Sequence, residues 1–371
     1  MSRRVLVTGG AGFIGSFLVD ALVDRGHDVV VFDNLEEQVH GRGLPGYLHQ
    51  GARYIWGDVL SYDSLKEVVL NAEVIFHEAA MVGVGQSQYQ IRQYVEVNTL
   101  GTANLLDILA NNRHECTKLI VAGSMSSYGE GLYVCDRDGP LRPPLRTAEQ
   151  MAAGDWEIHC PRCGRHVQPA PTPESATQLC NSIYAITKKD QEEMVMVFGR
   201  TYGLPTVTLR YFNVYGPRQS LSNPYTGVAA IFISRIKNDQ PPVVYEDGLQ
   251  TRDFVSVHDV VQANLLAMEN DTANGEVFNV GSGEAVSILQ VASSLAEVCG
   301  RHIQPQVTWQ FRKGDVRHCV ADIDKITRLL GYRPRFSFTN GMRELIDWSR
   351  EAQSADHFQE AALQLASRGL A

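Results

Sequence analysis

Tyr184 and Lys188 form the clearest chemical pair in the chain, because they stand four positions apart in a segment with helical character. Residues at positions i and i+4 share one face of a helix, so the Lys188 ammonium would lie close to the Tyr184 phenol. A neighbouring cation favours the phenolate and lowers a tyrosine pKa from about 10 towards the working pH. Tyr184 is therefore a candidate general base, although this spacing also occurs by chance in many helices.

A glycine-rich turn near the start of the sequence supplies a second kind of site. Gly9, Gly12 and Gly15 follow an apolar segment, Val5–Thr8, and open an expected helix over Gly12–Arg25. Missing side chains let the backbone turn tightly and approach a pyrophosphate, which the helix N-terminus attracts. The alternative is an ordinary tight turn, but the strand before it and the helix after it favour a dinucleotide site.

Polar residues at the ends of the next strands indicate which dinucleotide binds. Val29–Phe32 is followed by Asp33, whose carboxylate can accept hydrogen bonds from ribose hydroxyls and would repel a 2′-phosphate, so NAD is preferred over NADP. Asp58 either accepts from the adenine amino group or is only a turn residue. His77 fits a hydrogen-bonded structural role better than a catalytic one. The positions expected around NAD are Gly9, Gly12, Phe13, Ile14, Asp33, Asn34, Asp58, Val59, Ala79, Ala80, Asn98, Tyr184, Lys188, Tyr211 and Val214.

Strands and helices that alternate through the first third of the chain must position these groups. With nearly uninterrupted apolar strands, they predict an α/β protein with a Rossmann-like, doubly wound parallel sheet. The NAD-binding domain is expected over 1–212, with a loop-rich, cysteine-bearing insertion at about 132–180. A smaller mixed α/β substrate lobe is expected over 213–350, with about 251–270 returning to the first domain, and a solvent-exposed helical tail over 351–371. The helices expected beyond the insertion are Tyr184–Tyr202, Val228–Lys237, Asp259–Glu269, Ile288–Val298 and Gly341–Ser349.

Composition and charge narrow the choice of partners. The 371 residues are 44% hydrophobic, which allows a sizeable core, and carry a formal net charge of −9. A nucleic acid or an anionic membrane would require a concentrated excess of Lys and Arg, so neither is expected. The chain has no apolar run of membrane-spanning length, and its first strand leaves no room for a signal peptide, which predicts a cytoplasmic protein with reduced cysteines.

Four segments together resemble the extended short-chain dehydrogenase/reductase family, and the match covers roughly residues 3–350. The resemblance implies that Ser124 relays a proton between a sugar hydroxyl and Tyr184, with Lys188 as the third catalytic residue. It also implies that Asn98 steadies the cofactor region and that the substrate is a nucleotide-diphosphate sugar. The segments are Gly9–Gly15, Ser124–Gly129, Tyr184–Lys188 and Arg210–Arg218.

Met125 and Ser126 bear on the choice of reaction within this family. Nucleotide-sugar 4,6-dehydratases carry an Asp-Glu or Ser-Glu pair at these positions, and the Glu removes the C5 proton. Neither residue of this chain is an acid or base of that kind. The resemblance therefore favours 4-epimerisation, in which C4 is oxidised transiently and re-reduced on its other face while NAD is recycled.

Arginines are expected at the nucleotide end of the substrate site. Arg252 and Arg312 match positions that bind the diphosphate in similar epimerases, and a planar guanidinium donates two hydrogen bonds to phosphate oxygens. The alternative is a surface salt bridge, such as one between Arg252 and Asp253. The resemblance also assigns Asp315 to the ribose. The expected substrate contacts are Val84, Ser87, Ser124, Met125, Ser126, Asn213, Tyr225, Val228, Tyr245, Arg252, Arg312 and Asp315.

The insertion between Ser124 and Tyr184 carries a candidate metal site. Cys160–Gly164 has the C-x-x-C-G form of a zinc knuckle, and Cys135–Gly139 looks like a knuckle whose second cysteine has become aspartate. A structural zinc on the three cysteines is one reading, and a degenerate knuckle without metal is the other. The ligands considered are Cys135, Cys160 and Cys163, with Asp138, His159 or His166 as the fourth.

The cysteine-bearing insertion and the segment Ser222–Val228 are also similar to bacterial dTDP-L-rhamnose 4-epimerases, which implies conversion of dTDP-L-rhamnose to dTDP-6-deoxy-L-talose. The main alternative is a UDP-sugar 4-epimerase acting on UDP-glucose, UDP-GlcNAc or UDP-glucuronate. A 4,6-dehydratase and a non-catalytic NAD-binding regulatory protein are weaker alternatives. The family resemblance further implies a homodimer packed through the helices Tyr94–Ala110 and Tyr184–Tyr202.

Overall fold

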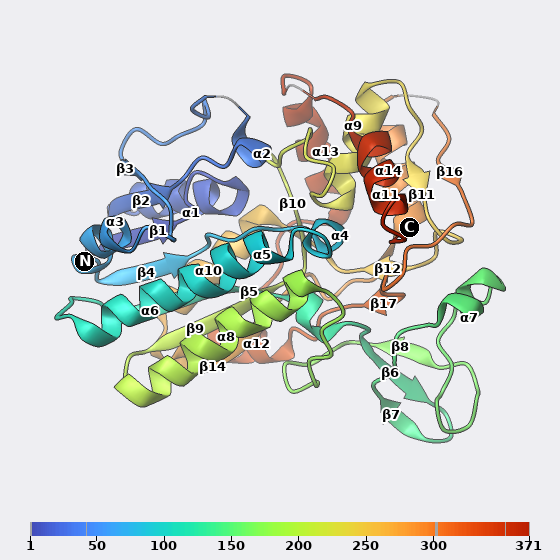
Figure 1. Cartoon of the computed structure of the whole chain (residues 1–371), viewed down its shortest axis with the longest axis horizontal. Coiled ribbons are helices and arrows are strands. Elements are labelled where there is room, and N and C mark those ends of the chain that lie inside the picture. Colours follow the sequence, from blue (N-terminus) through green and yellow to red (C-terminus); the bar gives the residue numbers. More distant parts are fainter. Residues whose placement is uncertain (1, 42, 301–302, 353, 371) are drawn as a thin grey trace.

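A seven-stranded, fully parallel sheet forms the centre of the computed structural model, which describes residues 2–41, 43–300, 303–352 and 354–370 (Figure 1). The strand order is β14-β9-β5-β4-β1-β2-β3. The strand order reverses between β1 and β4, which opens a crevice at the carboxyl ends of the strands. The strands are β1 (Arg4–Thr8), β2 (Asp28–Asp33), β3 (Arg53–Trp56), β4 (Val74–His77), β5 (Lys118–Ser124), β9 (Thr206–Tyr211) and β14 (Glu276–Val280).

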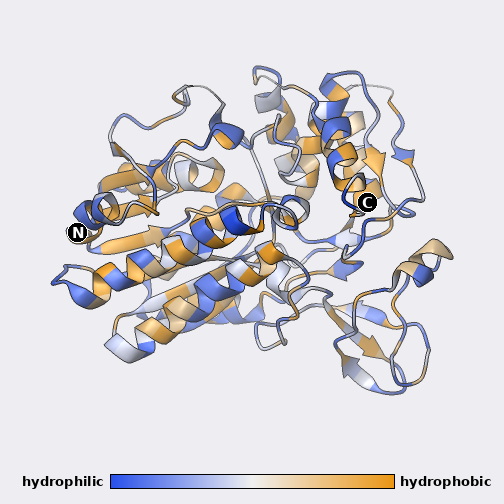
Figure 2. Ribbon diagram, viewed as in Figure 1, coloured by the Kyte–Doolittle hydropathy of each residue, from blue (hydrophilic) through white to orange (hydrophobic). Residues whose placement is uncertain are grey.

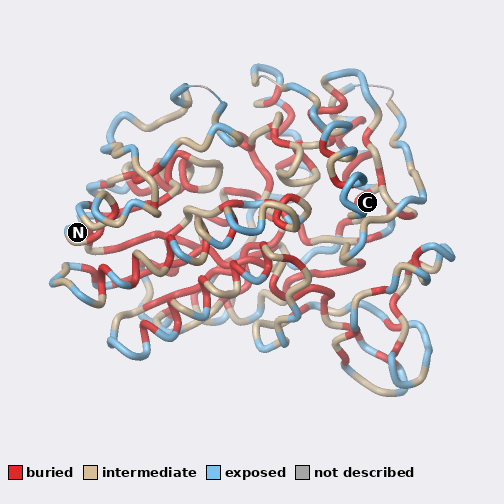
Figure 3. Tube along the Cα trace, in the orientation of Figure 1, coloured by how far each residue is buried: buried red, intermediate tan, exposed pale blue. Residues whose placement is uncertain are grey.

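Helices cover both faces of the sheet, because side chains along each strand alternate between the faces. In β1, Val5 and Val7 pack with α1 and α10, whereas Leu6 packs with α3, α6 and α8 on the other face. Figure 3 shows the buried strands beneath partly exposed helices. This arrangement confirms the predicted Rossmann-like fold. The helices are α1 (Phe13–Asp24), α3 (Tyr62–Val69), α6 (Gly101–Asn111), α8 (Ile183–Tyr202) and α10 (Val257–Glu269), and shorter turns are α2 (Glu37–His40), α4 (Val84–Ser87), α5 (Ile91–Tyr94), η1 (Val95–Leu100), η2 (Met125–Tyr128) and η3 (Asp271–Ala273).

A smaller mixed α/β lobe has its own hydrophobic core, built where three helices pack together with Val244 and Phe254. These helices are α9 (Val228–Lys237), α11 (Ile288–Val298) and α13 (Phe338–Ser349), close to the expected bounds. Short strands pair as β10-β13, β11-β16 and β15-β12-β17. Their bounds are β10 (Asn213–Tyr215), β11 (Val243–Val244), β12 (Thr251–Arg252), β13 (Phe254–Ser256), β15 (Val286–Ser287), β16 (Gln306–Val307) and β17 (His318–Cys319).

The return of the chain to the NAD-binding domain extends further than the expected residues 251–270. After α10, the chain adds β14 to the edge of the sheet beside β9. It comes back once more as α12 (Asp324–Leu330), whose Ile326 and Leu330 join the core under the sheet. The sequence gives little indication of β14, because this strand has only five residues and lies in a region without a regular hydrophobic pattern. Its place in the sheet depends on its pairing with the distant strand β9.

The insertion at residues 132–180 is a small antiparallel sheet, which differs from the expected loops. The strand β6 (Leu132–Cys135) pairs with β7 (Gly139–Leu141) on one side and with β8 (Gln168–Ala170) on the other, and α7 (Ala148–Ala152) follows β7. The unit stands apart from the main body at the lower right of Figure 1. Six buried residues give it a modest core of its own: Tyr133, Cys135, Leu141, Ile158, Cys160 and Val167.

Buried ion pairs attach the insertion to the substrate lobe. Arg146 of the insertion donates two hydrogen bonds to Glu246, at 2.8 and 2.9 Å. Arg317 of the lobe, whose side chain is fully buried, donates to Glu157 of the insertion at 3.0 Å and to Asp247 at 2.7 Å. Removing one partner would leave a buried charge unpaired, so these pairs hold the insertion in one position.

The helix α14 (Phe358–Ala366) confirms helical structure near the C-terminus but differs from the expected solvent-exposed tail. Its Ala361 and Leu365 are buried, because the helix folds back onto the protein. Figure 1 shows it in red in front of the substrate lobe. In the part of the chain that the structure describes, no helix has both the length and the apolar character needed to cross a membrane.

Candidate active site

One cavity of about 650 Å³ runs along the carboxyl edge of the sheet and continues between the two lobes. The segments that follow β1, β2, β4, β5 and β9 form its inner part, whereas α9, residues 312–316 and α14 form its outer part. Every cofactor and substrate residue expected from the sequence lines this cavity, except Ser87 and Asn98. The fold therefore brings the glycine turn, the Tyr-Lys pair and the arginines into one space.

The glycine turn is tight enough to exclude side chains. A Cβ on Gly9, whose φ is +70°, would lie 2.8 Å from the Ala79 backbone, and one on Gly15 would collide with the Gly9 carbonyl oxygen. No side chain caps the start of α1, where Phe13 and Ile14 line the cavity. The first N–H groups of this helix are therefore placed to bind an anionic pyrophosphate.

Asp33 lies at the end of β2 beside the glycine turn. Its carboxylate accepts hydrogen bonds from the backbone N–H groups of Ala11 and Leu35, at 3.0 and 2.8 Å. Each carboxylate oxygen can still accept from a ribose hydroxyl. Two residues after the neighbouring strand β3, Asp58 accepts a hydrogen bond from the Asn34 side chain at 2.9 Å. Strand ends that are distant in sequence thus share the adenosine end of the cavity.

Tyr184 stands in the first turn of α8, facing Ser124 at the end of β5. Ser124 hydrogen-bonds to the Tyr184 phenol, and its hydroxyl lies 2.8 Å from the Ser126 hydroxyl. Burial raises the pKa of Tyr184, and the hydrogen bond with Ser124 only partly opposes this rise. The expected lowering of this pKa is therefore not produced by the residues of the chain, because burial dominates.

Glu78 is a half-buried carboxylate at the site, to which the sequence analysis assigned no role. It accepts a hydrogen bond from the Tyr211 hydroxyl at 2.9 Å and attracts the Lys188 ammonium, which donates to Gln191 at 2.7 Å. Burial raises the pKa of Glu78 and lowers that of Lys188, and their mutual attraction opposes both shifts. The preceding His77 has its pKa lowered to about 3, mainly by burial, and is hydrogen-bonded to two threonines as a structural residue.

Asn98 and Ser87 support the cavity from behind its wall. Asn98 lies in the π-helical segment η1, where it accepts from the Met81 backbone at 2.7 Å and donates to Thr187 at 2.9 Å. This amide thereby ties the loop after β4 to α8. The Ser87 hydroxyl, on α4, accepts a hydrogen bond from the Tyr184 backbone N–H at 3.0 Å. Both residues therefore position Tyr184 or its surroundings without lining the cavity.

The two arginines at the outer end have different surroundings. Arg252 does not pair with Asp253, which is buried and accepts only from other groups, and it donates instead to backbone carbonyls of residues 316 and 317. Arg312 lies 4.7 Å from the centre of the Tyr245 ring and donates to Asp315 at 3.1 Å. The salt-bridge alternative raised for Arg252 and Asp253 is therefore wrong for this pair.

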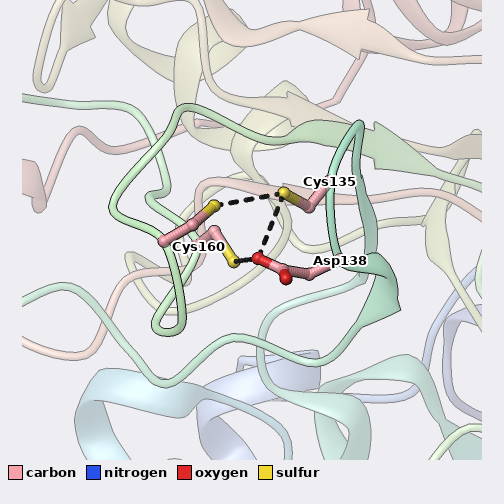
Figure 4. A group of neighbouring side chains, drawn as sticks. Cys135, Asp138 and Cys160 are labelled. Carbon is pink, nitrogen blue, oxygen red and sulfur yellow. Dashed lines mark hydrogen bonds between the residues drawn. The ribbon is translucent and has the colours of Figure 1, made fainter.

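A cluster of three cysteines and an aspartate lies inside the insertion, outside the cavity. Figure 4 shows Cys135, Cys160 and Asp138 pointing towards one another. Asp138 Oδ2 lies 3.8 Å from Cys135 Sγ and 3.2 Å from Cys160 Sγ, and Cys163 Sγ lies 3.5 Å from Cys135 Sγ. All four ligand atoms fall within 4.8 Å of one another.

Comparison with known proteins identifies the family. Residues 5–153 match the model of the NAD dependent epimerase/dehydratase family, and residues 165–345 match that of GDP-mannose 4,6 dehydratase. The chain is 35% identical over 355 residues to a dTDP-L-rhamnose 4-epimerase from Burkholderia thailandensis. The aligned region covers 93% of this chain and 94% of that protein. It is 30% identical over 362 residues to a UDP-N-acetyl-alpha-D-glucosaminuronate decarboxylase from Bacillus cytotoxicus, with 95% and 100% covered. The structure of a UDP-glucuronic acid 4-epimerase from Bacillus cereus, in complex with UDP-glucuronic acid and NAD, superposes with a TM-score of 0.77 at 28% identity, covering 94% of this chain and 99% of that one.

The parallel sheet, the glycine turn and the Tyr-Lys pair on one cavity define an extended short-chain dehydrogenase/reductase. The chain belongs to the NAD-dependent epimerase/dehydratase family, as its sequence predicted. It is an NAD-dependent enzyme of the nucleotide-sugar epimerase/dehydratase type.

Proposed function

We propose that the enzyme is a nucleotide-sugar 4-epimerase in which Tyr184, Ser124 and Lys188 carry the proton chemistry. Bound NAD would accept a hydride from C4 of the sugar and return it to the opposite face. Tyr184 removes the proton of the 4-hydroxyl, and Ser124 relays it through its hydrogen bond to the phenol. Lys188 lies one turn along α8 and stabilises the phenolate. Oxidation at C4 gives a 4-keto sugar. Because this ketone stays in the cavity, its reduction is effectively an intramolecular step.

The cavity residues fit NAD, because a Cβ on Gly9 or Gly15 would collide with the backbone of the turn, and the uncapped start of α1 leaves N–H groups for a pyrophosphate. Asp33 would accept from the adenosine ribose and repel the 2′-phosphate of NADP. The other residues that would hold the cofactor are Gly12, Phe13, Ile14, Asn34, Asp58, Val59, Ala79, Ala80, Tyr184, Lys188, Tyr211 and Val214, with Asn98 behind them.

The observation that favours epimerisation is the composition of the turn after Ser124. In η2 this turn carries Met125 and Ser126, and the Ser126 hydroxyl is already hydrogen-bonded to Ser124. Removal of the C5 proton, which 6-dehydration requires, therefore has no carboxylate on this turn to carry it out. Among the described residues of the cavity wall, the carboxylates are Asp33, Glu36, Asp58, Glu78 and Asp315, and all come from other segments.

The substrate we propose is dTDP-L-rhamnose, which would be converted to dTDP-6-deoxy-L-talose. Its support is the similarity to the Burkholderia thailandensis enzyme over nearly the whole length of both proteins. A UDP-sugar 4-epimerase is the second candidate, favoured by the likeness to the UDP-glucuronic acid 4-epimerase. In either case Arg252 and Arg312 would bind the diphosphate and Asp315 the ribose. The remaining proposed contacts are Val84, Ser87, Met125, Ser126, Asn213, Tyr225, Val228 and Tyr245.

Proton NMR of the wild-type enzyme with four substrates tests this proposal. We expect dTDP-L-rhamnose to approach an equilibrium with its 4-epimer, without a stable keto product and with little turnover of UDP-glucose, UDP-GlcNAc or UDP-glucuronate. Preferred epimerisation of a UDP-sugar would overturn the sugar assignment and favour the second candidate. Loss of the sugar 6-substituent or of carbon dioxide would overturn 4-epimerisation itself.

We also propose that the cysteine cluster binds a structural zinc ion. Ligand atoms about 2.3 Å from a tetrahedral zinc lie about 3.8 Å apart, close to the separations found among Cys135, Asp138, Cys160 and Cys163. The two segments that supply the ligands, Cys135–Asp138 and Cys160–Cys163, have similar backbone turns. Gly139 and Gly164 follow them with φ of +72° and +73°, the left-handed conformation that ends a knuckle turn.

Asp138 is the fourth ligand that this proposal selects. The His159 ring lies 4.4 Å from that of His166, and its Nε2 is hydrogen-bonded to Asp155 at 2.7 Å. His159 is thus engaged away from the cluster, whereas the Asp138 carboxylate lies among the thiols. A carboxylate with three thiolates is an acceptable donor set for zinc.

We further propose a homodimer formed through α8 and the neighbouring η1-α6 segment. Figure 2 shows hydrophobic turns along both helices, which lie side by side. A group of large, exposed apolar side chains on these helices is typical of a surface that contacts another protein. They are Val95, Leu100, Ile186, Val197 and Tyr202, each at least 42% exposed. Sedimentation velocity at micromolar concentration should show a dimer, and a monomer alone would contradict this arrangement.

A further inference from the structure

The helix α14 covers the outer side of the active-site cavity with an apolar face. Leu365 is 7% exposed on this face, whereas Leu363 on the opposite face is 71% exposed. The residues near the C-terminus that line the cavity are Phe358, Ala361, Ala362, Leu365 and Leu370. All of them are apolar, so none of the described residues by which the C-terminal segment lines the cavity has a side chain that could hydrogen-bond to a substrate.

Contacts near both ends of α14 hold it across the gap between the lobes. Before the helix, Asp356 accepts a hydrogen bond at 3.1 Å from the buried Arg235 of α9. Near its other end, Gln364 Oε1 lies 3.1 Å from the hydroxyls of both Tyr89 and Tyr225, which lie 2.7 Å from each other. Tyr89 comes from the NAD-binding domain and Tyr225 from the substrate lobe. The helix therefore connects both lobes over the cavity.

The short helix α4 places Leu365 near the catalytic tyrosine. A Cβ on Gly85 would lie 3.4 Å from the Leu365 side chain, so the two segments are in contact. Two residues further along α4, Ser87 accepts a hydrogen bond from the Tyr184 backbone at 3.0 Å. Val84 of the same helix lines the cavity and is 43% exposed. The helix α4 thus contacts Leu365 at Gly85 and the Tyr184 backbone at Ser87, and it exposes Val84 to the same cavity.

We propose that α14 forms the outer wall of the sugar subsite and that Leu365 is a specificity-determining residue. With Val84 and Ala361 it favours a sugar that carries a methyl group at C6 over one that carries a hydroxyl or a carboxylate. A polar substituent against this wall would lose its hydration without gaining a hydrogen bond, whereas a methyl group would gain apolar contact. This inference rests on the proposed 4-epimerase function.

Kinetics of two matched leucine variants test the proposal. Leu365→Ala should raise the KM for dTDP-L-rhamnose about tenfold with little change in kcat, because one lost apolar contact is worth a factor of this order. Leu363→Ala, on the exposed face of the same helix, should leave both constants unchanged. Inhibition by dTDP alone should be equal in all three proteins. Equal KM values for the two variants, or an equal loss of dTDP affinity in Leu365→Ala, would overturn the proposal.

Hydrogen-deuterium exchange supplies a readout that does not depend on turnover or on the folding of a variant. In the wild type, dTDP-L-rhamnose should slow exchange in residues 356–368, whereas dTDP should leave them unchanged. Equal protection by both ligands, or by neither, would place α14 outside the sugar subsite. If instead the wild type epimerises no nucleotide sugar, the proposed function fails, and the exchange comparison still decides where the sugar lies.

Discussion

Replacing Tyr184 with phenylalanine is expected to lower kcat by at least about 100-fold, because proton transfer by a positioned side chain contributes a factor of about 10²–10⁴. The substitution removes only the phenolic oxygen that takes the 4-hydroxyl proton. The ring would keep its packing against Tyr94, whose centre lies 6.3 Å away. Affinity for dTDP-L-rhamnose should therefore stay close to that of the wild type. NMR-detected turnover and isothermal titration measure the two quantities separately.

Tyr94→Phe is the matched control for this prediction. Tyr94 is buried beside Tyr184, but its hydroxyl is directed to Gln86 at 3.3 Å and it does not line the cavity. Its removal should leave turnover within about twofold of the wild type, since no reacting group is lost. If Tyr184→Phe retained more than a tenth of the wild-type kcat, the general base would have to be another residue. A parallel loss of affinity would instead indicate a binding role.

Cys160→Ser is expected to lose the zinc ion and to melt at a temperature several degrees below that of the wild type. Cys160 is buried in the small core of the insertion, where the proposed metal would join two knuckle turns. A structural zinc contributes directly to the folding free energy of a unit that has few apolar contacts of its own. Elemental analysis of the purified wild type should find about one zinc per chain.

Cys180→Ser provides the control, because Cys180 lies just beyond the insertion strands and its thiol is near the Ser127 carbonyl oxygen, away from the cluster. It should keep its zinc. Asp138→Cys should also keep the metal, since it completes a four-cysteine site. Wild-type protein without zinc, even after purification in zinc-containing buffer, would contradict the proposal. So would full zinc occupancy in Cys160→Ser.

The inner half of the cavity could be predicted from local patterns. Gly9, Asp33, Glu78, Ser124 and Tyr211 all stand at or just after the ends of parallel strands. Such ends meet along one edge of the sheet, so residues that are distant in sequence become neighbours in space. Glu78 follows this rule but was not assigned to the site, because a lone acidic residue after a strand does not reveal that Lys188 and Tyr211 will surround it.

The outer half depended on contacts between distant segments. The tail pattern predicted a helix, but an amphipathic helix does not indicate which surface it will cover. Tyr89, Tyr225 and Gln364 meet only because two lobes and the tail converge. In the same way, the choice of Asp138 over His159 as a metal ligand depends on side-chain directions within the insertion.

By itself, the sequence predicted the family and the Rossmann-like sheet, because the motifs of the resemblance and the apolar strands are local patterns. It proposed Tyr184 and Lys188 from their spacing on a helix, and Ser124 from the family resemblance. Only the tertiary structure decided that burial raises the Tyr184 pKa, that Glu78 attracts the Lys188 ammonium, and that α14 lines the cavity. Desolvation and wall composition depend on which distant segments exclude water from a site. That information resides in the packing and not in any local pattern.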